Sequence, residues 1–112
     1  MDSRQLAVLA AKTMDDKKAE DIIILHIEEK ASFADYFVLA SGKSERQIGA
    51  LADDVDDAFA IEGVIAKNIE GKKESGWILM DFGDVIVNVL TEEMRSRYNI
   101  EKVWADCEVI TE

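Results

Sequence analysis

The chain alternates between apolar stripes at helical spacing and short apolar runs, a pattern that predicts three helices and five strands. In Ser3–Lys18 the apolar and small residues recur at intervals of three and four, which is typical of one face of a helix. Asp2 or Ser3 can cap its start. A second stripe with the same spacing predicts a helix that is capped by Ser44 and runs to about Ile61.

The strands are predicted from β-branched and apolar runs. These runs are Asp21–Ile27, Tyr36–Ser41, Val64–Glu70, Trp77–Phe82 and Val85–Leu90. A short third helix follows, with Thr91 as its cap and Asn99 as its left-handed end. The order α-β-β-α-β-β-β-α predicts a single α/β (α+β) domain over residues 1–112, in which helices flank a mixed five-stranded sheet.

The last two strands predict a hairpin whose two faces differ. With a two-residue turn at Phe82-Gly83, the facing pairs on one side are Asp81 with Asp84, Leu79 with Ile86, and Trp77 with Asn88. The opposite face holds only apolar residues and glycine, so we assign it to the core. A solvated face rarely carries a tryptophan and two aliphatic residues at its centre. We therefore interpret the first face as a candidate surface for a partner.

Composition narrows the classes of partner. The chain has 24 Asp and Glu against 13 Lys and Arg, which gives a net charge of −11. A surface this acidic repels phosphate backbones and anionic lipids, so we do not expect direct binding to nucleic acid or to membranes. Because Cys107 is the single cysteine and His26 the single histidine, no internal disulfide or Cys/His zinc set can form. An unpaired cysteine is typical of a reducing compartment, so we expect a cytoplasmic protein. We expect His26 to be a hydrogen-bonded structural residue.

The run Asp81-Phe-Gly-Asp84 also admits a catalytic interpretation. A metal-dependent nucleotidyltransferase would need a pair of carboxylates that holds Mg²⁺ near phosphates, on the strand that follows the Ser41-Gly42 turn. The strand Val64–Glu70 supplies no such pair. We expect Asp81 and Asp84 to be hairpin-turn residues and the protein to have no enzymatic activity, no metal and no cofactor. Mg²⁺-dependent nucleotide turnover would support the catalytic alternative.

Three separated blocks of sequence resemble the ribosomal silencing factor family, also called Iojap. They are Ser32–Ile48, Gly76–Asn88 with the pattern G-W-x-L-x-D-F-G-D, and Glu92–Asp106 with the pattern E-x-x-R-x-x-Y-N-I-E-x-V-W. The resemblance extends over nearly the whole chain. It implies a mixed-sheet fold related to nucleotidyltransferases but without their catalytic centre. It also implies binding to ribosomal protein number fourteen of the large subunit, which prevents small-subunit joining and lowers translation under nutrient limitation or in stationary phase.

The resemblance also implies a set of partner-binding residues. Carried over by position, these are Trp77, Leu79, Asp81, Asn88, Glu92, Arg95, Tyr98 and Trp104. Trp77 and Leu79 would be apolar anchors, and the acids Asp81, Asp84 and Glu92 would pair with Lys or Arg of the partner. Arg95 and Tyr98 would orient or support the patch. Many relatives carry His where this chain has Asn88, and an aromatic residue where it has Leu90.

Two further possibilities stay open at this level. A factor for assembly of the large subunit would occupy the same ribosomal surface on precursor particles. A homodimer could form through the apolar hairpin face when the partner is absent.

Overall fold

Helices and strands follow one another in the order that the hydrophobic pattern predicts, with one strand added near the end. The computed structural model describes residues 1–110 of the chain. Its helices are α1 (Ser3–Asp16), α2 (Glu45–Ile61) and α3 (Glu92–Tyr98), with the short 3-10 helices η1 (Lys73–Ser75) and η2 (Ile100–Trp104). Its strands are β1 (Glu20–His26), β2 (Tyr36–Gly42), β3 (Asn68–Glu70), β4 (Trp77–Asp81), β5 (Val85–Thr91) and β6 (Glu108–Ile110).

The six strands found in residues 1–110 form one mixed sheet in the order β3-β4-β5-β2-β1-β6. Strands β2 and β5 are parallel, and the other neighbouring pairs are antiparallel. The α+β class is confirmed, but the count of five strands is wrong because β6 pairs with β1 at the edge of the sheet. Strand β3 also begins at Asn68 rather than at Val64. No helix within the described range is long and apolar enough to cross a membrane.

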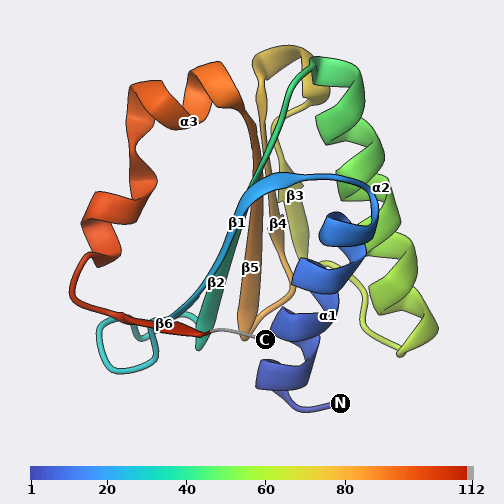
Figure 1. The fold of residues 1–112 in the computed structure, drawn as a ribbon. Helices are drawn as coiled ribbons and strands as arrows, with labels where there is room; N and C mark the ends of the chain where they lie inside the picture. Colours follow the sequence, from blue (N-terminus) through green and yellow to red (C-terminus); the bar gives the residue numbers. More distant parts are fainter. Residues whose placement is uncertain (111–112) are drawn as a thin grey trace.

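Helices α1 and α2 cover one face of the sheet, and α3 with η2 lies on the other side (Figure 1). The predicted caps at the two long helices are confirmed, since the Asp2 side chain accepts from the Gln5 backbone and the Ser44 side chain from that of Gln47. The main core lies between these helices and the sheet, and Phe59 of α2 is fully buried there. The two helices therefore bury one face of the sheet.

The hairpin of β4 and β5 has a different register from the predicted one. Leu79 pairs with Asn88 and Trp77 pairs with Leu90, so the predicted pairing was wrong by two residues. The Phe82 backbone N–H donates to the Val85 carbonyl, and Gly83, at φ +95°, begins the turn. A glycine at positive φ is what the first turn position of a tight hairpin favours. Because the shift is by two residues, every side chain stays on its predicted face.

Candidate protein-docking surface

The face of the sheet opposite α1 and α2 carries the residues that the sequence singled out. Strand pairing places Leu79 of β4, Asn88 of β5 and Leu39 of β2 in one row across this face. Trp77 lies at the start of β4, paired with Leu90. The predicted anchors Trp77 and Leu79 are both half-buried, so each keeps part of its side chain at the surface.

Helix α3 brings a second aromatic side chain to Trp77. The rings of Trp77 and Tyr98 lie with their centroids 5.4 Å apart at an angle of 44°. Tyr98 is 54% exposed, so the aromatic pair is open to solvent on the side of α3. The Trp77 indole N–H donates to the side-chain oxygen of Asn88 at 2.9 Å. Trp77 is thus held between a tyrosine on one element and an asparagine on another.

A shallow depression lies beside these anchors. It has a volume of about 390 Å³, and its lining includes Trp77, Leu79 and Met94. Met94 precedes Tyr98 by four residues on α3, so both side chains lie on the same side of that helix. Sequence reasoning missed Met94, although this spacing was visible in the chain. We refer to Trp77, Leu79, Met94 and Tyr98 together as the Trp77 surface.

The three predicted acids lie in different settings. Asp81 is half-buried and accepts the Gly83 backbone N–H at 2.8 Å, so its carboxylate stabilises the hairpin turn. Asp84 is exposed in the same turn, at the opposite end of the hairpin from Trp77. Glu92 is exposed at the start of α3, and the neighbouring carboxyl of Glu20 raises the pKa of Glu92. Of the three acids, Glu92 alone lies near Trp77, because it comes two residues after Leu90, the residue of β5 that pairs with Trp77.

Arg95 is buried and connects four elements. From α3, its Nη1 donates to the backbone carbonyl of Asp21 and to the Ser41 hydroxyl at 3.1 Å, and its Nε donates to the Glu101 carboxylate at 3.1 Å. Only 8% of the residue is exposed. These contacts fix α3 and η2 to the strands β1 and β2.

Trp104 belongs to a separate aromatic group on the same side of the sheet. Its ring lies 5.9 Å from that of Phe37 and 6.2 Å from that of Phe33. It packs with Leu25 and Cys107 on a small cluster under η2. Sequence reasoning also missed Phe33, which is exposed in the loop before β2. The aromatic contacts thus place Trp104 with this cluster, whereas Tyr98 is the ring that meets Trp77.

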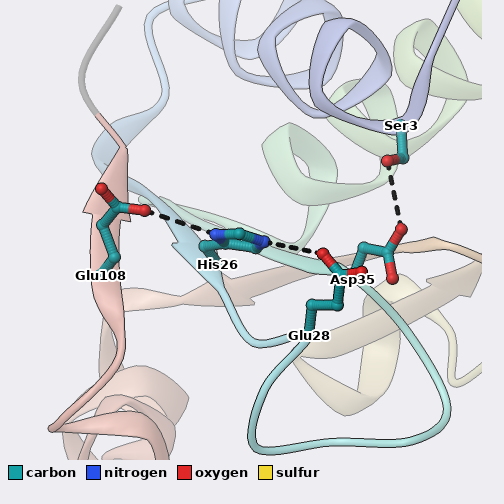
Figure 2. A network of polar contacts seen from close by, with 5 residues as sticks. All are labelled: Ser3, His26, Glu28, Asp35 and Glu108. Atoms are coloured by element: carbon teal, nitrogen blue, oxygen red, sulfur yellow. Dashed lines mark hydrogen bonds and ion pairs between the residues drawn. The ribbon is translucent and has the colours of Figure 1, made fainter.

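His26 lies on the face covered by α1 and α2, away from the Trp77 surface. Its ring nitrogens lie 3.1 Å from a Glu28 carboxylate oxygen and 3.3 Å from one of Glu108 (Figure 2). The His26 ring also stacks on that of Tyr36, with the ring centroids 4.7 Å apart. The two carboxylates raise the pKa of His26, with the Glu28 hydrogen bond as the largest cause. The sequence interpretation of a hydrogen-bonded histidine is confirmed, and the contact to Glu108 connects β1 with β6.

Across residues 1–110, no three side chains of His, Cys, Asp or Glu converge so that they could hold a metal ion.

Known proteins resemble this chain along its whole length. A family model described as "Ribosomal silencing factor during starvation" matches residues 1–112. The ribosomal silencing factor RsfS of Bacillus subtilis is 41% identical over 106 residues, which cover 95% of this chain and 90% of that protein. The mouse protein named mitochondrial assembly of ribosomal large subunit protein 1 is 29% identical over 91 residues, which cover 79% of this chain and 40% of that protein.

The fold is also found in solved structures. A crystal structure of a protein from Chromobacterium violaceum matches with a TM-score of 0.90 and 34% identity, over 94% of this chain and 88% of that one. The bacterial relatives bear the name of a regulatory factor rather than that of an enzyme. With the full-length family match and this level of identity, the chain belongs to the ribosomal silencing factor family.

Proposed function

We propose that this protein binds the large ribosomal subunit through ribosomal protein number fourteen and sterically blocks joining of the small subunit. Translation is thereby repressed in the cytoplasm under nutrient limitation or in stationary phase, with no chemical step. The observation that carries this proposal is the Trp77 surface, an aromatic and aliphatic patch on a sheet face that α1 and α2 leave uncovered. Half-buried aromatic anchors of this kind dominate the energetics of many protein interfaces.

The charge of the chain supports a protein partner on the ribosome over ribosomal RNA. A net charge of −11 repels RNA phosphates, whereas it attracts the Lys and Arg side chains of a basic ribosomal protein. Glu92, exposed at the start of α3, follows the end of β5 that pairs with Trp77 and can meet such cations there. Asp84 is exposed at the far end of the hairpin and would meet cations at the rim of the interface. Long-range attraction of this type raises the association rate and weakens as salt increases.

Binding to purified large subunits tests the proposal. Trp77→Ala removes the indole together with its contact to Tyr98, and we expect it to weaken binding by about 30-fold, which corresponds to roughly 2 kcal/mol. Ile65→Ala is a matched control, because Ile65 is a large apolar residue that is 71% exposed in the α2–β3 connection. Equal affinities of wild type and Trp77→Ala would show that the docking surface lies elsewhere.

A salt series and a subunit-joining assay complete the test. With ribosomal protein number fourteen alone, we expect the association rate to fall with salt while the dissociation rate changes little. Adding the protein to large subunits should reduce the fraction of joined ribosomes in sedimentation. Undiminished joining at saturating protein would contradict steric occlusion.

A role in assembly of the large subunit is the second candidate. It is favoured by the mouse relative, whose name places it in assembly of the mitochondrial large subunit. Both roles use the same ribosomal surface, so binding does not separate them. Accumulation of precursor particles in a depleted strain would favour assembly, whereas normal subunits with altered joining would favour silencing.

Self-association through the Trp77 surface is a related proposal. A homodimer of the free protein would dissociate when ribosomal protein number fourteen is added, because both contacts need the same side chains. Sedimentation equilibrium with and without that protein distinguishes a competing dimer from an independent one.

A further inference from the structure

Asn88 is a polar residue that lies between two leucines in a row across the sheet. It is fully buried, and its neighbours across the row are Leu79 on β4 and Leu39 on β2. Its side-chain oxygen accepts from the Trp77 indole, but its amide nitrogen has no hydrogen-bond partner in the part of the chain that the structure describes. A buried amide with an unmade hydrogen bond costs folding stability, so packing alone does not explain an asparagine here.

The direction of the hydrogen bond fixes which atom of Asn88 faces Trp77. An indole N–H can only donate, so Asn88 must present its carbonyl oxygen to it. The amide NH₂ is then left without an acceptor among the described residues. The same bond restricts rotation of the Trp77 ring, which also lies against the exposed ring of Tyr98.

We infer that Asn88 is a positioning residue, which holds the Trp77 indole in the orientation that the partner recognises. Asn88 itself is fully buried, so its side chain presents no surface for a partner to contact. Its contribution is to order the ring before binding, so that less rotational freedom is lost when the complex forms. This role in binding rests on the proposed function of the Trp77 surface, whereas the hold on Trp77 is a property of the free protein.

The free protein provides the first measurement. Asn88→Leu keeps the branched shape of the side chain but removes both the acceptor and the unpartnered donor. In an NMR spectrum we expect the indole N–H resonance of Trp77 to move and to broaden or split, while that of Trp104 serves as an internal reference. An unchanged Trp77 resonance would overturn the inference. The midpoint of urea unfolding should not fall, since the unmade hydrogen bond is also removed.

Binding to large subunits provides the second measurement. We expect Asn88→Leu to bind about 3- to 10-fold more weakly, the effect of losing one neutral hydrogen bond. Trp77→Phe keeps an aromatic ring but has no N–H, and it should lose affinity by a similar factor. In the Trp77→Phe background, Asn88→Leu should cause no further loss. Losses that multiply would show that Asn88 acts independently of the indole, and unchanged binding of Asn88→Leu would also refute the role.

A conservative variant separates positioning from simple packing. Asn88→His offers a ring nitrogen as acceptor, so it should restore both the Trp77 resonance and most of the affinity that Asn88→Leu loses. Failure of His to restore either would count against the hydrogen bond as the cause. If the wild-type protein does not bind large subunits at all, the proposed function is wrong, and the Trp77 resonance alone then decides whether Asn88 holds the ring.

Discussion

Replacement of Arg95 by methionine should destabilise the whole side of the molecule that carries α3. Arg95→Met keeps most of the side-chain stem and removes the guanidinium. The change eliminates the hydrogen bonds to the Asp21 carbonyl, the Ser41 hydroxyl and the Glu101 carboxylate. These partners lie on β1, β2 and η2, so the single substitution removes the Arg95 hydrogen bonds from α3 to all three elements.

The magnitude follows from the burial of the partners. Removing one member of a buried charged pair lowers the free energy of unfolding by about 3–5 kcal/mol when the other charge stays buried without a partner. The Glu101 side chain is 34% exposed and can turn to water, so part of that cost is relieved. We therefore expect a loss of about 2–4 kcal/mol. At about 4 °C per kcal/mol for a domain of this size, the melting temperature should fall by roughly 8–16 °C.

Urea unfolding followed by tryptophan fluorescence, together with calorimetry, measures this loss. Arg97→Met is the matched control on the same helix, because the Arg97 side chain is 58% exposed and pairs with Glu93 one turn away. Such a surface pair contributes about 0.3–0.5 kcal/mol. If the two variants lowered stability by equal amounts, the reasoning about the buried guanidinium would be refuted.

Two other predictions concern β6 and the turn before Trp77. Glu28 and, to a smaller extent, Glu108 raise the pKa of His26 above 6.5. While the Glu108 carboxylate is ionised, its pairing with His26 is complete below pH 6.5 and is lost as pH rises through the raised folded-state pKa. Backbone amide exchange in β6 should therefore accelerate with pH beyond the intrinsic rate, and His26→Gln should abolish this excess. Gly71 has φ +82°, and a Cβ at this position would collide with the Trp77 carbonyl oxygen. Gly71→Ala should therefore lower the free energy of unfolding, measured in urea, by at least about 2 kcal/mol. It should also weaken binding to large subunits. Gly63→Ala, at φ +78° with open space around it, should cost only about 1 kcal/mol.

The sequence was most informative where local rules decide the structure. The caps at Asp2, Ser44 and Thr91 and the left-handed end at Asn99 were all predictable, because each depends on a few adjacent residues. Strand β6 was not, since three residues show too little alternation and its pairing with β1 joins distant parts of the chain.

The hairpin turn shows how a local rule can be applied one position too early. Phe82 was assigned to the turn, but its ring packs on that of Phe59 with centroids 4.2 Å apart, so Phe82 belongs to the core. Gly83 and Asp84 form the turn instead. The preference of a large aromatic residue for the core was readable from the chain and would have given the correct register.

The sequence predicted which residues of the candidate site lie at the surface, but not which of its polar residues are buried. Trp77 and Leu79 were identified from face alternation, and both lie partly at the surface. Asn88 and Arg95 are buried, although their polarity is typical of exposed positions. Their burial depends on partners from other elements, which no local pattern reveals.

Strand β6 has a consequence for solubility. It pairs with Ile24–His26 and so covers backbone groups at what would otherwise be the edge of β1, a strand rich in β-branched residues. Open edges of that composition pair with other chains and aggregate. The two outer strands of the described sheet, β3 and β6, are each three residues long and each carries a glutamate, which discourages extension of the sheet. Lengthening of the sheet by a second chain is therefore disfavoured at both of its edges.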